Sequence, residues 1–203
     1  VTLIGWAAFQ SCSSLTSITI PESVTLIGYG AFANCHNLES VTIECDINAT
    51  IGNYLFAGCE NLQNFMGTFA STDNRCMIVN GTLNSFAPAG LTEYIIPEGV
   101  TSVGYGAFSG CQSLVSITIP ESVTSIGNNA FSSCYGLTSI VIPNGVTSIG
   151  DYTFYDCKNL TDVAIPEGVT SIGNQSFKMC SSITSFTIPE SVTSIGDEAF
   201  YCS

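Results

Sequence analysis

The sequence predicts an α/β solenoid built from 23-residue units, and three observations support that prediction. One frame, V-T-S-[IV]-G-x-x-x-F-x-x-C-x-x-[LI]-x-x-[IVF]-x-I-P, recurs between Val100 and Phe200 without insertion or deletion. Each unit has two short apolar stretches, one ending at proline and one at glycine, which is typical of strands. A fixed period between about 20 and 50 residues is typical of repeat architectures, in which each unit contacts only its neighbours.

A single unit cannot bury enough apolar surface to fold alone, so the units are expected to stack and share their apolar faces. In one unit the residues expected to point inward are Val123, Ile126, Ala130, Phe131, Cys134, Leu137, Ile140 and Ile142. Because units of this kind cover nearly the whole length, residues 1–203 are expected to form one domain. The chain opens inside the frame and stops inside a unit, so we expect a segment of a longer protein.

The composition excludes several classes of partner. Sixteen acidic residues face three basic ones, giving a formal net charge of −13. Nucleic acids and anionic membrane surfaces require clustered lysine and arginine, so neither is an expected partner. No apolar run approaches the roughly 20 residues of a membrane span, so no membrane insertion is expected from this segment.

Within the first unit, residues 15–21 alternate and end at proline, which predicts a strand, and residues 24–28 predict a second short strand closed by a turn glycine. Several of these glycines are followed by a residue type common at helix N-caps, namely Asn128, Asp151, Asn174 and Asp197. One or two turns of helix are therefore expected in each unit.

The frame is lost between residues 63 and 90. There, two apolar runs, residues 76–79 and 82–86, flank Asn80-Gly81. This pattern predicts a β-hairpin with a two-residue type I′ turn. We expect either an insertion tolerated in an exposed loop or a protrusion dedicated to binding.

In the regular units the strand motif reads Leu114-x-x-Ile117-x-Ile119-Pro120, and the glycine motif reads Val123-x-x-Ile126-Gly127-x-x-Ala130-Phe131-x-x-Cys134. This pattern resembles the BspA-like branch of the leucine-rich repeat proteins. The resemblance implies a leucine-rich repeat solenoid with a concave parallel β-sheet and with short strands and helical turns on the convex side. It also implies an extracellular or cell-surface location, because such proteins are typically surface proteins of bacteria and mucosal protozoa and are often described as adhesins.

The cysteines are expected to be structural. Seven of them hold one repeat position: Cys12, Cys35, Cys59, Cys111, Cys134, Cys157 and Cys180. Stacking places them in a column of parallel side chains, which favours buried free thiols over disulfides. Cys45, Cys76 and Cys202 lie outside the column, and a disulfide between Cys45 and Cys76 remains an alternative. With no CxxC pair and one histidine, no metal site or other cofactor is expected.

No catalytic residue is predicted. His36 directly follows a column cysteine, at a position that other units fill with varied polar residues, which indicates an exposed site. The acids after the strand prolines, Glu22, Glu98, Glu121, Glu167 and Glu190, are expected to form a solvated edge, with weak Ca²⁺ binding as the alternative.

The candidate binding surface is the outward side of the proline-terminated strands, where most side chains are serine or threonine. One patch departs from this pattern, and its residues are Glu93, Ile95, Ser116, Thr118, Ser139, Val141, Asp162 and Ala164. Small hydroxyl residues also suit any solvated sheet. We expect a monomeric, non-enzymatic adhesion module that binds a host or neighbouring-cell protein or glycan. The alternative is a spacer that presents another domain and has no ligand of its own.

Overall fold

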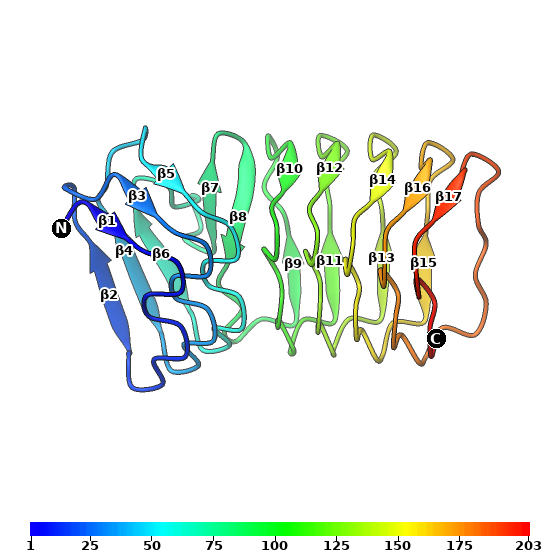
Figure 1. The fold of residues 1–203 in the computed structure, drawn as a ribbon, viewed down its shortest axis with the longest axis horizontal. Coiled ribbons are helices and arrows are strands. Elements are labelled where there is room, and N and C mark those ends of the chain that lie inside the picture. Colours follow the sequence, from blue (N-terminus) through cyan, green and yellow to red (C-terminus); the bar gives the residue numbers. More distant parts are fainter.

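The computed structural model describes residues 1–203 as a stack of coils, most of which contribute one strand to each of two rows (Figure 1). Row A contains β2 (Ser17–Ile20), β4 (Ser40–Ile43), β6 (Asn64–Gly67), β9 (Glu93–Ile95), β11 (Ser116–Thr118), β13 (Ser139–Val141) and β15 (Asp162–Ala164). Row B contains β1 (Leu3–Ile4), β3 (Leu26–Ile27), β5 (Thr50–Ile51), β8 (Thr82–Phe86), β10 (Ser102–Val103), β12 (Ser125–Ile126), β14 (Ser148–Ile149), β16 (Ser171–Ile172) and β17 (Ser194–Ile195), and β7 (Cys76–Val79) flanks β8.

The strand register confirms the 23-residue period. Ser116 of β11 pairs with Glu93 of β9 in parallel, and Ser125 of β12 pairs with Ser102 of β10. The eight residues predicted to point inward in the unit beginning at Val123 are all buried, none more than 8% exposed. Row A is interrupted and forms three sheets, β2-β4-β6, β9-β11 and β13-β15.

The predicted helical turns are wrong, because the structure contains no helix and therefore none long and apolar enough to cross a membrane. The segment after each repeat glycine is a run of turns, and together these segments form what we call the turn face: residues 5–14, 28–37, 52–61, 104–113, 127–136, 150–159, 173–182 and 196–203. Here some N–H groups bond three residues back, as Ser132 does to Asn129 (3.1 Å), while the N–H of Phe131 reaches Thr153 in the next unit (2.9 Å). Asn129 and Ser133 have φ near +57° and +58°, which an α-helix does not allow.

The residues expected to cap helices serve the stack instead. The side-chain oxygen of Asp151 accepts a hydrogen bond from the backbone N–H of Asn174, its equivalent in the next unit (2.7 Å). Asn128 and Asn174 accept in the same way from Asp151 and Asp197. A residue type that suits an N-cap also suits this position, since both require a short side chain that accepts from a nearby N–H.

The hairpin is confirmed at the predicted residues, with φ of 50° at Asn80 and 77° at Gly81, as a type I′ turn requires. It is neither an exposed insertion nor a protrusion. Met77 and Phe86 are almost fully buried, and β8 pairs in parallel with β10, so the hairpin is a layer of the stack.

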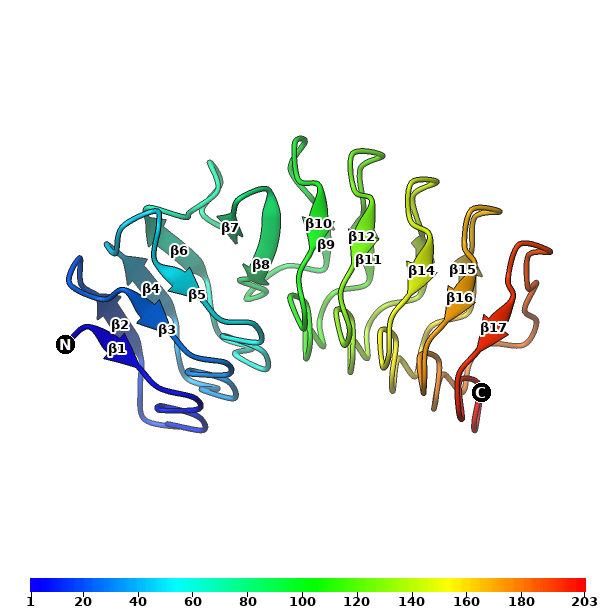
Figure 2. The same cartoon turned by 45° about the horizontal axis from the view of Figure 1, so that its top comes forward.

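On the turn side, this irregular layer is missing. The N–H of Tyr54 bonds directly to the carbonyl of Tyr105 (3.2 Å), and Gly58 bonds to Ser109 (2.9 Å), across the sequence that contains the hairpin. Because the opposite side has one more layer, the stack bends toward the turn face, and Figure 2 shows an arc with the turn segments on its inner, lower edge. The expectation that row A lines the concave side is therefore not met.

The last strand of row A is absent. Residues 183–188 match the strand motif but form no strand, and no backbone hydrogen bond joins them to β15. Phe186 takes the inward position where β15 has Val163, and its ring packs edge-to-face on Phe177 and Phe200. The larger ring needs more room than a valine.

Candidate binding surface

The structure brings the eight predicted site residues together on the outward face of β9, β11, β13 and β15. Ile95 lies beside Thr118, and Val141 lies beside Ala164, in parallel register. The two sheets adjoin, because the N–H of Thr138 bonds to the carbonyl of Val115 (3.1 Å). Ser116 is half-buried and the other seven are exposed, with Ile95 at 71% and Val141 at 67%. Two aliphatic side chains thus stand in solvent on an otherwise polar sheet.

A hollow of about 280 Å³ borders this patch where β15 faces residues 183–188. Its lining includes Asp162, Ala164 and Glu167 on one side and Ser185 and Thr187 on the other. This hollow could not be predicted from the sequence, because the strand motif of residues 183–188 predicts continued pairing.

At the other end of the patch, a polar cluster connects row A to the hairpin. The hydroxyl of Tyr94 donates to Asp73 (2.9 Å) and lies 3.1 Å from the Sγ atom of Cys76. Burial raises the pKa of Asp73, but hydrogen bonds from Ser71, Arg75 and Tyr94 outweigh it and hold that pKa below its usual value. Burial also raises the pKa of Cys76, to about 12. The cluster fixes the hairpin in the stack and offers no reactive thiolate.

The cysteine column is confirmed as a set of free thiols. Each thiol from Cys134 onward donates to the carbonyl of the phenylalanine in the preceding unit, as Cys157 does to Phe131 (3.1 Å). Cys45 and Cys76 are also free and buried, in two separate clusters of the core, so the alternative disulfide is not formed.

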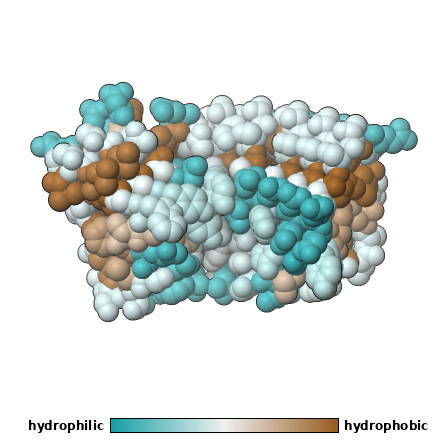
Figure 3. Space-filling model, viewed as in Figure 1, coloured by the Kyte–Doolittle hydropathy of each residue, from teal (hydrophilic) through white to brown (hydrophobic).

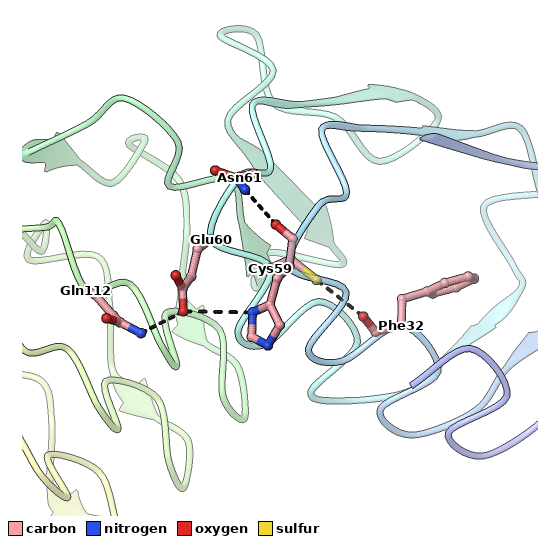
Figure 4. Close-up of polar contacts among 6 residues, drawn as sticks. Phe32, Cys59, Glu60, Asn61 and Gln112 are labelled. Atoms are coloured by element: carbon pink, nitrogen blue, oxygen red, sulfur yellow. Dashed lines mark hydrogen bonds and ion pairs between the residues drawn. The ribbon is translucent and has the colours of Figure 1, made fainter. Parts of the chain in front are cut away.

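His36 lies on the turn face and contacts Glu60 of the next unit. Figure 4 shows Glu60 beside Gln112. The Nδ1 atom of His36 is 3.9 Å from Oε1 of Glu60, which also accepts a hydrogen bond from Gln112 (2.6 Å). More than half of the His36 side chain is exposed. These contacts join the turn segments of neighbouring layers.

The turn face also carries surface residues that sequence analysis missed. The single tryptophan and seven of the eight tyrosines lie on the turn face: Trp6, Tyr29, Tyr54, Tyr105, Tyr135, Tyr152, Tyr155 and Tyr201. Figure 3 shows hydrophilic residues gathered over part of the C-terminal half, pale residues beside them toward the N-terminal half, and hydrophobic residues at both ends. The signal was present in the sequence, because every one of these rings falls between the repeat glycine and the second residue after the column cysteine.

The comparisons with known proteins agree with this architecture. A family model described as the BspA type leucine rich repeat region matches residues 1–76 and 82–203 in six copies. A leucine-rich repeat protein of T. pallidum is 27% identical, with 84% of this chain and 79% of that chain covered and a TM-score of 0.55.

Two more distant structures share the fold. A leucine-rich repeat protein of Bacteroides ovatus is 24% identical over 100% of this chain and 80% of that one, with a TM-score of 0.52. The pneumococcal vaccine antigen PcpA is 17% identical over 97% of this chain and 71% of that one, with a TM-score of 0.54. The search of curated proteins found no match.

Proposed function

Because the chain belongs to the BspA-type leucine-rich repeat family, we propose that it is a non-enzymatic binding module of a secreted or cell-surface protein. Its ligand is a host or neighbouring-cell protein or glycan, held on the patch of row A from Glu93 to Ala164. The family resemblance supports the location and the role in adhesion.

The observation that supports this site most directly is the exposure of Ile95 and Val141 on a rigid polar sheet. Isolated aliphatic side chains on a protein surface are common, but these two lie on neighbouring sheets within one patch that also carries Glu93 and Asp162. Mixed polarity of this kind supplies both contact area and orientation to a partner. Because each of these strands is paired with a neighbour in its row, binding orders few new residues and loses little conformational entropy.

The test replaces Ile95 and Val141 with lysine together and measures binding to immobilised extracellular-matrix proteins and to an array of glycans. We expect the double variant to fold normally and to lose binding. The matched control, Ser125→Lys with Ser148→Lys, adds the same charge to exposed positions of row B and should leave binding intact.

If a ligand is found and only the row B variant loses it, the site lies elsewhere. If broad screens of proteins and glycans find no ligand for this patch, the spacer function replaces the adhesion function.

A further inference from the structure

We propose that the turn face holds a second site, which binds a neutral polysaccharide on a platform formed by Trp6, Tyr29 and Tyr105. This site is distinct from the row A patch, which contains no aromatic residue. Its residues come from turn segments 5–14, 28–37 and 104–113. The first two are neighbours, and segment 52–61 alone separates the last two, because the irregular layer is absent on this side.

The tyrosines form a tight cluster at the place where the turn segments skip the hairpin. The ring centroid of Tyr29 lies 5.7 Å from that of Tyr54, nearly parallel, and 5.7 Å from that of Tyr105, edge-on. Tyr54 and Tyr105 are 5.8 Å apart. Gly106 leaves the space for this packing, since a Cβ atom there would collide with the ring of Tyr54. The rings are therefore held in place before any ligand arrives.

The cluster still presents surface to solvent. Tyr29 is 40% exposed, and Trp6, at the equivalent position of the preceding unit, is 75% exposed. The hydroxyl of Tyr105 accepts from the side-chain amide of Asn129 (3.0 Å), so a polar group lies at the rim of the platform. Burial, and then the contact with Tyr105, raise the pKa of Tyr29, which keeps its hydroxyl protonated.

The chemistry of this face fits a sugar better than a protein partner. The negative face of an aromatic ring attracts the weakly positive C–H groups on one side of a sugar ring. Asn53 is exposed on this face, between the segments of Tyr29 and Tyr105, and its side-chain amide offers a donor and an acceptor to neighbouring hydroxyls. Protein interfaces are enriched in arginine and have an apolar centre. This face has no arginine, and its one branched aliphatic residue, Leu55, is fully buried.

The charge of the chain selects among polysaccharides. With a net charge of −13 and no basic cluster, the protein repels sulfated or carboxylated chains. A neutral polymer escapes this repulsion. A chain of sugar rings also suits a solenoid, since Trp6 and Tyr29 hold equivalent positions in successive units.

The chain has a built-in reporter for the test, since Trp6 is its only tryptophan. Soluble β-1,3-glucan, β-1,4-glucan and α-mannan oligosaccharides are titrated while Trp6 emission is followed, and the affinity is measured in parallel by calorimetry. We expect at least one of these probes to give a saturable blue shift. Trp6→Ala and Tyr29→Ala should each weaken the calorimetric affinity roughly tenfold, the loss of a ring contact.

The matched control is Tyr201→Ala, which removes an exposed ring at the far end of the same face and should leave affinity unchanged. Ile95→Lys with Val141→Lys should also leave it unchanged, so failure of the row A site is distinguished from failure of this one. Trp6 has no aromatic partner, so its variant tests the site even if Tyr29→Ala unfolds.

Three results would each overturn the proposal. They are the absence of a saturable shift with every neutral probe, an equal response to heparin, and a calorimetric affinity that neither Trp6→Ala nor Tyr29→Ala reduces.

Discussion

Cys134 illustrates how one residue serves both the core and the stack. It is fully buried, as its apolar surroundings in the sequence predict, and its Sγ donates to the carbonyl of Phe108 in the preceding unit (3.1 Å). At the end of the chain Ser203 holds the same position, and its hydroxyl donates to the carbonyl of Phe177. The column position therefore suits a small side chain with one donor. Sequence spacing alone could not reveal this bond, because spacing gives the position of a side chain and not the direction in which it points.

Substitutions at Cys134 should separate these two roles. Cys134→Ser keeps a donor of similar size, whereas Cys134→Ala leaves the Phe108 carbonyl without this bond, so alanine should destabilise the protein by about 1 kcal/mol more than serine. Urea denaturation of the two variants measures the difference. An alanine variant more stable than the serine variant would mean that the hydrogen bond contributes nothing.

The buried thiols should also make the protein sensitive to alkali. Burial raises the pKa of Cys180 to about 12, from an ordinary value of 9.0. Such a group contributes its full stabilisation below pH 9. As the pH rises toward 12, the thiol of the unfolded chain loses its proton before the buried thiol does, so the free energy of unfolding falls. The urea midpoint should therefore drop between about pH 8.5 and pH 10.5.

The control for this effect is Cys202, which is exposed. Cys202→Ser should leave the pH dependence unchanged. In the native protein a thiol reagent should modify Cys202 and the half-buried Cys12, and all ten cysteines should react after unfolding without reductant. Failure of the eight buried thiols to react after unfolding would contradict their assignment as free.

At the scale of elements, local pattern predicted the strands and the hairpin well. Alternation before Pro21 and Pro120 and the Asn80-Gly81 turn each depend on nearby residues, which the sequence displays directly. The turn segments were mistaken for helix because their backbone groups are satisfied by the next unit. The bond from Phe154 to Ser176 (2.8 Å) joins residues 22 positions apart, and no local propensity reports it.

The hairpin turn can be tested at Gly81. Its φ of 77° is unfavourable for residues with a Cβ atom, and a Cβ atom there would lie 3.0 Å from the Thr101 hydroxyl. Gly81→Ala should cost about 1–2 kcal/mol, since the left-handed region carries a penalty of that size. Gly99→Ala is a useful comparison, because its φ is also positive while nothing lies within 4 Å. Thermal unfolding of both variants separates the cost of the close contact from the cost of backbone strain. A larger loss of stability in the Gly99 variant than in the Gly81 variant would contradict the role given to Thr101.

For the whole molecule, the period predicted one stacked solenoid and placed the irregularity at residues 63–90. It could not predict that only one side of the stack gains a layer there. The hydrogen bonds between Tyr54 and Tyr105 and between Gly58 and Ser109 are consequences of three-dimensional closure. For the same reason the row A residues could be placed on one face from sequence, while the tyrosine cluster, which depends on the skipped layer, could not.

The skipped layer also divides the core into two clusters, one from Ile4 to Ala87 and one from Cys76 to Ala199. When a repeat stack is pulled by its two ends, it opens where neighbouring layers share the fewest core contacts. In this protein that boundary lies near the middle of the stack, between the two core clusters. Held between two fixed points, the protein should extend in two steps of unequal length, which an optical trap resolves as two force plateaus. A single plateau would mean that the hairpin joins the halves mechanically. A stack with such a joint can lengthen under load by unfolding one half while the other half remains folded.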